Sequence, residues 1–173
     1  MTNISIKLED IKYLREKTGV GFIICKNILI KCNNNLDQAI FELKNLSIEL
    51  AKNLRKRPTK EGIIKSYVHP GNQRGALIEL KCESDFVARH PSFEILAQYL
   101  AYHLTILDNY SYIHSDELPK GLKEVINPIK IFCSNQCLDN PLITIDEYIL
   151  QSISEFKENI IISRYLKLIF DKN

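Results

Sequence analysis

The chain has 173 residues and a formal net charge of +2 at pH 7, with 45% hydrophobic and 25% charged residues. This composition is typical of a folded globular protein and excludes a disordered or collagen-like chain, and the small net charge gives no strong field that would favour nucleic acid or a membrane surface as a partner. The length allows one domain or two small ones.

The five cysteines form an odd-numbered set, lie mostly far apart and follow no secretory signal. We interpret them as reduced thiols in a reducing compartment, most of them small core residues. Residues 1–10 contain neither an apolar signal segment nor an Arg-rich amphipathic stretch, and no run reaches the ~18 apolar residues that a membrane span needs. We therefore expect no membrane partner and no transit peptide, so that the protein would be made in the compartment where it acts.

Three short helices are predicted in the first part of the chain. Apolar residues at helical spacing, or in a nearly continuous run, define them at 8–17, 22–32 and 36–43. A glycine-containing loop at 18–21 and three asparagines at 33–35 separate them. Residues 1–46 are thus expected to form a compact three-helix module. Its first loop would place Val20, Phe22 and Ile23 either at the surface or against the third helix.

Residues 47–61 are basic around Pro58, and we interpret them as a linker. A solvated helix end followed by a tether explains such charge. An RNA-binding patch would need interleaved aromatic side chains on which bases could stack, and this stretch has none. We therefore expect no direct contact with nucleic acid.

The period of the apolar residues changes from helical to alternating after Gly62. Residues 63–68 and 76–82 alternate, and Pro70-Gly71-Asn72 lies between them, which predicts a β-hairpin. The second strand leads directly into the segment 83–87.

A helix is predicted to begin at Pro91, because proline favours the first helical position and the apolar residues that follow form one stripe up to Leu107. The tyrosine-rich stretch 110–113 is interpreted as a further strand. Residues 115–143 are expected to be irregular, since prolines and a glycine interrupt them repeatedly.

The pattern Thr144-Ile145-Asp146-Glu147 predicts a capping box and therefore the start of a helix, which would end near Lys157. Alternation over 160–170 predicts a closing strand. The expected fold class is α+β: an N-terminal three-helix module is joined by the linker to a core, residues 62–173, in which an antiparallel three-stranded sheet packs against helices.

Three segments together resemble one known family. The first, LREKTGVGFIICKNIL followed by NNNLDQAIFELK, is similar to the amino-terminal signature of elongation factor Ts and to its ubiquitin-associated (UBA)-like three-helix module. The residues that match this pattern are Thr18, Gly19, Gly21, Cys25 and Lys26. The run Phe22-Ile23-Ile24 departs from it, since the family usually has a methionine pair and an aspartate there. The apolar contact would survive, but a salt bridge at Ile24 would be lost.

The second segment, EGIIKSYVHPGNQRGALIELKCESDFVARHPSF, carries the strongest resemblance and is similar to cyanobacterial and plastid versions of the family. Its centre, residues 84–88, matches a motif usually written Thr-Asp-Phe-Val-Ala, and Ser84 keeps the hydroxyl.

The third segment, TIDEYILQSISEFKENIIISRYLKL, resembles the carboxy-terminal end of the family. Lys157 and Ser163 stand where a glycine and an arginine are common. A helical hairpin that many members insert near residues 119–131 has no room here. The resemblance therefore implies a short form whose residues 62–173 correspond to the family's core, dimerisation-type domain.

What the resemblance implies is a guanine nucleotide exchange factor rather than an enzyme. Such a protein binds elongation factor Tu carrying GDP, disturbs the Mg²⁺ and phosphate site of Tu, and releases GDP so that GTP can bind. It needs no catalytic residue, metal or cofactor of its own, and the complex would be one-to-one or two-to-two. The expected location is a plastid that encodes the protein, or a bacterial cytoplasm. The alternative is a UBA-like protein-binding module without exchange activity.

Phe86 is the residue expected to matter most. On spacing alone it would be a core aromatic at a strand end, but the flanking motif favours a ring that wedges between helices of Tu, with Asp85 competing for polar groups near the metal. The residues expected to bind Tu are Ser84, Asp85, Phe86, Val87, Val20, Phe22, Ile23, Arg89, His90 and Tyr165.

One short motif in the chain partly matches the active site of an enzyme. Glu79-Leu80-Lys81 matches half of a metal-dependent nuclease site, but no acidic residue lies between Gly62 and Leu77 to complete the metal pair. Cys25 and Cys82 have no evident His-Asp relay that would activate a thiol nucleophile.

A zinc site is a further weak possibility. Cys133 and Cys137 are separated by three residues, but a second Cys or His pair at ligand spacing is missing, and His114 is the only near neighbour of the right type. We therefore expect no metal ligand in this chain.

Overall fold

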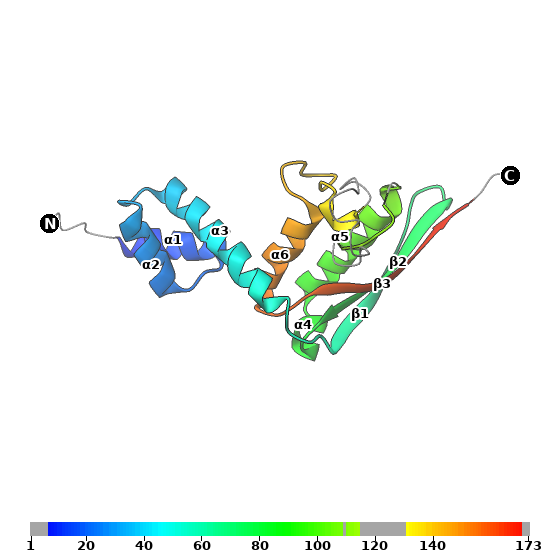
Figure 1. The fold of residues 1–173 in the computed structure, drawn as a ribbon, viewed down its shortest axis with the longest axis horizontal. Helices are drawn as coiled ribbons and strands as arrows, with labels where there is room; N and C mark the ends of the chain where they lie inside the picture. Colours follow the sequence, from blue (N-terminus) through cyan, green and yellow to red (C-terminus); the bar gives the residue numbers. More distant parts are fainter. Residues whose placement is uncertain (1–6, 109, 115–130, 171–173) are drawn as a thin grey trace, which may run out of the picture.

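The first three helices form a module at one end of an elongated molecule (Figure 1). The computed structural model describes residues 7–108, 110–114 and 131–170. The helices are α1 (Leu8–Thr18), α2 (Phe22–Lys31) and α3 (Leu36–Leu54). Their predicted starts and the two breaks between them are confirmed, while the UBA-like character of the module stays a prediction.

Local sequence explains where these helices begin and end. Gly19 ends α1 in the left-handed region at φ 65°, and its amide donates to the carbonyl of Arg15. Asn35 caps α3, because its side chain accepts a hydrogen bond from the amide of Gln38. The three helices bury a small core of their own around Leu14, Leu29 and Leu43.

The third helix is longer than the sequence pattern indicated. Residues 47–54, the first half of the predicted linker, are helical. Ser47 and Ala51 continue the buried face of Leu43 at steps of four, and Ala51 belongs to the core of the second half of the molecule. Small residues on that face allow α3 to pack against α6 (Ile145–Phe156), so α3 connects the two halves as one continuous helix (Figure 1).

The second half contains an antiparallel sheet with strand order β1-β2-β3. Its strands are β1 (Glu61–Val68), β2 (Arg74–Cys82) and β3 (Ile161–Ile169). The predicted hairpin and closing strand are therefore confirmed. Asn72, at φ 55°, and Gly71, at φ 95°, supply the left-handed conformations that the hairpin turn requires.

The prediction of a strand at 110–113 is wrong. Only Tyr112 makes a bridge, an isolated one with Ile131. Tyr110 instead donates its hydroxyl hydrogen bond to the carbonyl of Leu104, and Ile113 is buried in the core. The tyrosines satisfy the β-propensity pattern, but the side chain of Tyr110 bonds to the end of the preceding helix instead.

Helices cover one face of the sheet. The inward residues of β2 pack against α5 (Pro91–Ile106), and α6 lies on the far side of α5 (Figure 1). A short α4 (Asp85–Ala88) lies between β2 and α5, and a 3-10 turn, η3 (Phe132–Ser134), precedes α6. The starts of α5 at Pro91 and of α6 at the Thr144 capping box are confirmed.

The segment predicted to be irregular spans 115–143. Its residues 115–130 lie outside the described residues, as does most of the region where the missing hairpin would be inserted. Residues 131–143 contain the short η3 and isolated bridges at Ile131 and Gln136 but no α-helix or strand, as predicted. None of the helices in the described part of the chain is both long and apolar enough to span a membrane.

Candidate functional site

The tip between β2 and α5 is a single helical turn, α4, that holds one aromatic ring in solvent. Ser84 caps the turn, since its hydroxyl accepts a hydrogen bond from the amide of Val87 at 3.4 Å. Val87 is buried and anchors the turn to the core. Because Val87 occupies the inward position, the neighbouring Phe86 points outward and is 85% exposed. The prediction from spacing alone, that Phe86 would be a core residue, is therefore wrong.

A carboxylate from a segment more than 70 residues later in the chain fixes this tip. One oxygen of Glu158 accepts hydrogen bonds from the amides of Glu83 and Ser84, at 3.1 and 2.9 Å. Its other oxygen accepts from the Ser84 hydroxyl at 2.5 Å. Three hydrogen bonds to one ionised group are stronger than neutral ones, so the backbone leading into Phe86 is held rigidly.

The next residue, Asn159, ties the same tip to the end of α3. Its amide donates to a carboxylate oxygen of Glu83 at 2.6 Å, and its side-chain nitrogen donates to the carbonyls of Arg55 and Arg57 at 3.1 and 2.6 Å. Asn159 is buried. Glu158 and Asn159 together, hereafter the Glu158-Asn159 hub, therefore join β2, α3 and the α6–β3 connection.

Lys157 links this hub to the three-helix module. It ends α6 in the left-handed region, at φ 61°, and its ammonium group donates to the carbonyl of Gly19 at 3.3 Å. Glycine adopts that conformation at little cost, so Lys157 occupies a position that would suit a glycine. The contact places the first loop of the module beside the base of the tip.

The first loop divides into buried and exposed residues. Val20 is only 3% exposed and packs in the core of the module, whereas Phe22 is 39% and Ile23 72% exposed. The structure therefore leaves only Phe22 and Ile23 available for a partner. Val20 has a packing role in the free protein, as Val87 has at the tip.

The residues after Phe86 form a polar rim. Arg89 is exposed and forms an ion pair with Asp85 at 3.5 Å. The Nδ1 atom of His90 accepts a hydrogen bond from the amide of Ser92 and so caps α5. The ring of His90 also contacts Phe156 edge-on, at a centroid distance of 5.4 Å. His90 thus has a structural task in addition to any rim contact.

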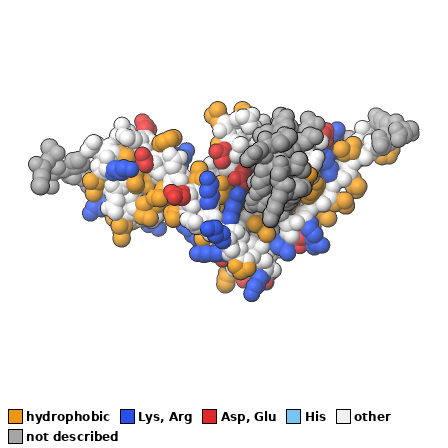
Figure 2. Space-filling model, viewed as in Figure 1, with side chains coloured by type: hydrophobic (Ala, Val, Ile, Leu, Met, Phe, Trp, Pro, Cys, Tyr) orange, Lys and Arg blue, Asp and Glu red, His pale blue; other side chains and the backbone are white. Residues whose placement is uncertain are grey.

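Lysines and arginines surround the tip. Exposed members on the end of α3, its following loop and the end of α4 are Lys56, Arg57, Lys60 and Arg89, hereafter the basic collar. Figure 2 shows basic side chains gathered where α3 meets the core and around α4. Basic residues of the predicted linker therefore lie around the exposed Phe86.

Tyr165 does not join this site. It lies in the middle of β3, opposite Ile78, and its ring packs against Tyr110 at 5.9 Å. Tyr110 follows the C-terminal end of α5, whereas α4 precedes its N-terminal end. The two ends of a 16-residue helix are roughly 24 Å apart.

The structure argues against the nuclease site and the cysteine nucleophiles that the sequence left open. Both carboxylate oxygens of Glu79 accept hydrogen bonds from Arg164, at 2.6 and 3.2 Å, and this pairing lowers the pKa of Glu79. A nuclease site would need that carboxylate for a metal. Burial raises the pKa of the Cys25 thiol and raises that of Cys82 to about 11, so both thiols are protonated near neutral pH and are poor nucleophiles.

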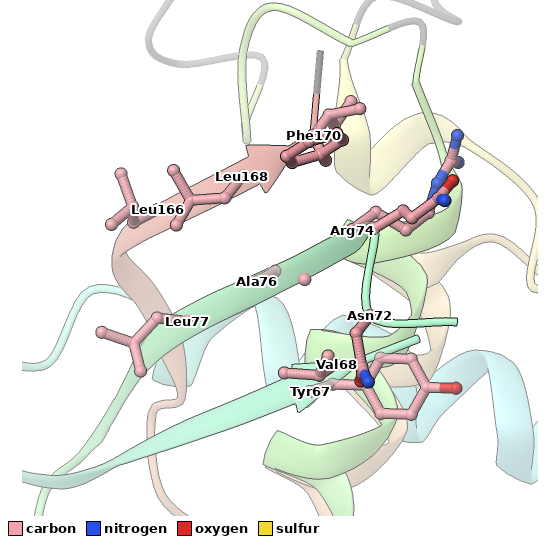
Figure 3. A pocket seen from close by; sticks show the side chains of 12 residues that line it. Tyr67, Val68, Asn72, Arg74, Ala76, Leu77, Leu166, Leu168 and Phe170 are labelled. Atoms are coloured by element: carbon pink, nitrogen blue, oxygen red, sulfur yellow. The ribbon is translucent and has the colours of Figure 1, made fainter. Parts of the chain in front are cut away.

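The outer face of the sheet is a second exposed apolar surface, which the sequence pattern did not predict. A shallow groove of about 470 Å³ lies between three elements of the sheet (Figure 3). It is lined by Leu166 and Leu168 of β3 with Phe170 just after it, by Leu77 of β2 and by Val68 of β1. All five side chains are more than a third exposed. The sequence of β3 could have indicated this surface, because it has apolar residues on both faces. A strand with one face in solvent would have polar residues on that face.

Comparison with known proteins gives close relatives over most of the chain, although no protein-family model matches it. The chain is 39% identical to elongation factor Ts, chloroplastic, of Guillardia theta, over 69% of this chain and 54% of that protein. It is 31% identical to the chloroplastic elongation factor Ts of Cyanidioschyzon merolae, over 93% of this chain and 92% of that protein. It is 30% identical to elongation factor Ts of the organism Acaryochloris marina, over 95% of this chain and 81% of that protein. The chain therefore belongs to the elongation factor Ts family of translation elongation factors.

Proposed function

We propose that this protein is a guanine nucleotide exchange factor that binds elongation factor Tu carrying GDP and releases the nucleotide so that GTP can bind. It performs no covalent chemistry, and its effect comes from binding the nucleotide-free state of Tu more tightly than the GDP-bound state. The side chains that contact Tu near its Mg²⁺ and phosphates are therefore the ones that lower its affinity for GDP. The proposed location is a plastid, in keeping with the chloroplastic relative of Cyanidioschyzon merolae, or a bacterial cytoplasm.

The observation that carries this proposal is the exposure of Phe86 on a rigid support. A phenylalanine that is 85% exposed gains roughly 1.5 to 3 kcal/mol when a partner buries it fully. Because Ser84 and Glu158 already fix the backbone beneath it, little further ordering is needed on binding. The ring is suited to wedge between helices of Tu and to displace the groups that hold Mg²⁺ and phosphate.

Charges around the ring support the same proposal. Asp85 can compete for cationic or amide groups that would otherwise hold phosphate, once it leaves its exposed pair with Arg89. The basic collar would speed the encounter with an acidic surface on Tu, because long-range attraction raises association rates more than final affinity. Exposed pairs such as Asp85 with Arg89 are weak, so exchanging partners costs little.

The three-helix module provides a second proposed contact. Phe22 and Ile23 are exposed on the loop whose neighbour Gly19 is bonded to Lys157. That bond and the continuous helix α3 hold the module and the tip in a fixed relative position. Two contact surfaces fixed in this way bind cooperatively when both reach the same partner.

The complex with Tu is proposed to be two-to-two rather than one-to-one. The outer sheet face, with Leu77, Leu166 and Leu168, leaves contiguous apolar surface exposed in a single copy. Such a surface is uncommon on a monomer and favours a second copy as its cover.

Release of labelled GDP from cognate Tu is the direct test. We expect the wild-type protein to accelerate release, and Phe86→Ala to slow the accelerated rate by about 10- to 150-fold, as the burial energy of the ring predicts. Leu142→Ala is a matched control, because Leu142 is 89% exposed and belongs to the loop before α6, on the opposite side of the core from α4 (Figure 1). Both variants should keep the stability of the wild type.

Two results would overturn the proposal. One is a wild-type protein that does not change GDP release from active Tu. That result, together with binding of another protein through Phe22 and Ile23, would instead support a UBA-like binding module without exchange activity. The other is an equal loss of activity in Phe86→Ala and Leu142→Ala, which would show that the exposed ring of the tip has no special part.

A further inference from the structure

The tertiary structure brings together three potential metal ligands that are far apart in the sequence. The ligand atoms of His114, Cys133 and Asp146 all lie within 4.8 Å of one another. They lie at a cavity of about 360 Å³ between α3, η3 and the start of α6. The sequence alone suggests Cys133 and Cys137, with His114, as a weak zinc site, whereas the fold brings Asp146 beside Cys133 and His114 as the third donor.

Backbone hydrogen bonds hold the three ligand-bearing segments against one another. The amide of Cys133 donates to the carbonyl of Ile113 at 3.0 Å, immediately before His114. The amide of Ile145 donates to the carbonyl of Asn135 at 2.9 Å, immediately before Asp146. Cys133 thus makes one of these backbone bonds itself, and His114 and Asp146 each directly follow a residue that makes one, which gives the preorganisation that a metal site requires.

The donor set is that of a thiophilic divalent ion. An imidazole nitrogen, a thiolate and a carboxylate oxygen suit Zn²⁺ and Co²⁺, whereas Mg²⁺ and Ca²⁺ prefer oxygen alone. Around a tetrahedral zinc ion such atoms are about 3.3 to 3.6 Å apart, so side-chain rotations of roughly 1 Å would close the cluster. Cys133 is buried, while His114 and Asp146 are partly exposed and give the ion a path from solvent.

The neighbouring charges are compatible with a bound cation. Arg55 pairs with one carboxylate oxygen of Asp146 at 2.5 Å and so leaves the other oxygen available. Ligating carboxylates are commonly oriented by such an outer partner. A thiolate and a carboxylate together neutralise the charge of a divalent ion, so the occupied site would add no net positive charge beside Arg55 and Lys52.

We propose that His114, Cys133 and Asp146 form a binding site for a zinc-like divalent ion, with the fourth coordination position open to the cavity. The ion would cross-link the segment after α5, η3 and α6. It would stabilise the core at the point where α3 of the three-helix module docks on α6. This site is separate from the Phe86 tip, so metal binding and nucleotide exchange can be tested independently.

Cobalt binding to the chelator-treated full-length protein tests the proposal. We expect one equivalent of Co²⁺ to produce a thiolate-to-cobalt charge-transfer band and the visible absorption of a tetrahedral complex. Added Zn²⁺ should displace the bound Co²⁺ and remove both absorptions. Cys133→Ser should abolish the band, and Asp146→Asn should weaken Co²⁺ affinity at least tenfold. Circular dichroism would show that each variant is folded.

Two matched controls separate ligation from folding. Cys137→Ser alters another buried thiol of the same core, one that hydrogen-bonds with Tyr99, and should keep the band. Arg55→Met removes the partner of Asp146 without removing a ligand and should also keep it. If Cys133→Ser fails to fold, Asp146→Asn, which changes a partly exposed side chain, still decides the case. The proposal is overturned if the wild type binds no stoichiometric Co²⁺, if the band survives Cys133→Ser, or if Asp146→Asn binds as tightly as the wild type.

Discussion

At the scale of single residues, the position of Phe86 depends on the residues around it more than on the ring itself. Val87 takes the buried position, Ser84 caps the turn, and Glu158 accepts three hydrogen bonds beneath it. A large apolar side chain exposed on such a rigid turn has no role in the stability of the free protein. The use we propose for the ring is its burial in a contact with elongation factor Tu.

The carboxylate of Glu158 provides a prediction at this scale. Glu158→Ala removes the acceptor of two backbone amides and one hydroxyl, and it should lower the free energy of unfolding by about 2 to 3 kcal/mol, because buried donors are left without partners. Glu155→Ala, an exposed change in the last turn of α6 just before the α6–β3 connection, should be nearly neutral. Urea unfolding of both variants measures the difference. Equal stabilities would contradict the role assigned to the hub.

At the scale of elements, the end of α6 connects packing with function. α6 ends with Lys157 in the left-handed conformation, and the chain then enters the Glu158-Asn159 hub and β3. A residue with a Cβ atom costs roughly 1 to 2 kcal/mol in that conformation. The strain persists because the hub and the first loop of the three-helix module hold both sides of the turn.

Replacing Lys157 tests this account. Lys157→Gly should raise the free energy of unfolding by about 1 kcal/mol, and the midpoint of thermal unfolding by about 2 to 4 °C, because glycine relieves the strain. Lys157→Ala keeps the strain and loses the bond to Gly19, so it should be slightly less stable than the wild type. Calorimetry can rank the three proteins. A glycine variant no more stable than the alanine variant would refute the explanation.

At the scale of the whole molecule, two faces of the part that the structure describes remain uncovered. One surrounds the tip and the first loop of the module, and the other is the outer face of the sheet (Figures 1 and 3). The helices cover only one side of three strands, so the residues that alternate outward on β2 and β3 meet solvent in a single copy. An exposed apolar face of this kind indicates contact with a further copy or a partner.

Self-association should follow from that face. We expect the free protein to be a dimer, and Leu168→Glu to make it a monomer, because a carboxylate cannot be buried without a partner. Leu142→Glu changes an equally apolar and more exposed position elsewhere and should remain a dimer. Light scattering coupled to size exclusion measures the mass. A monomeric wild type at the highest soluble concentration would contradict the expectation and favour the one-to-one complex.

Much of the fold could be predicted from local patterns. The hairpin followed from alternation and from a Pro-Gly-Asn turn, and α6 from its capping box at Thr144. These signals are local, since each depends on residues within one or two turns of the chain. The length of α3 was underestimated because the basic residues after Ser47 masked a buried face of small side chains, which exists only where α6 packs against it.

The site was predicted in part. The sequence singled out Phe86, Phe22 and Ile23, but it could not separate them from Val20 and Val87, because the pattern of a helix or a strand end does not say which of two adjacent apolar residues faces the core. Nor could it anticipate that Tyr165 lies at the other end of α5. These distinctions depend on packing between elements that are more than 70 residues apart, such as Ser84 and Glu158.

The sequence by itself determined the family of this protein, its class of fold, the positions of its helix starts and hairpin turn, and the segment in which the proposed exchange residue lies, because all of these are encoded in local patterns and motifs. Only the tertiary structure decided which side chains are exposed, how the hub joins the tip to α3 and to the first loop, and that His114, Cys133 and Asp146 meet. Burial and proximity are properties of the packed chain, and contacts between distant segments set them.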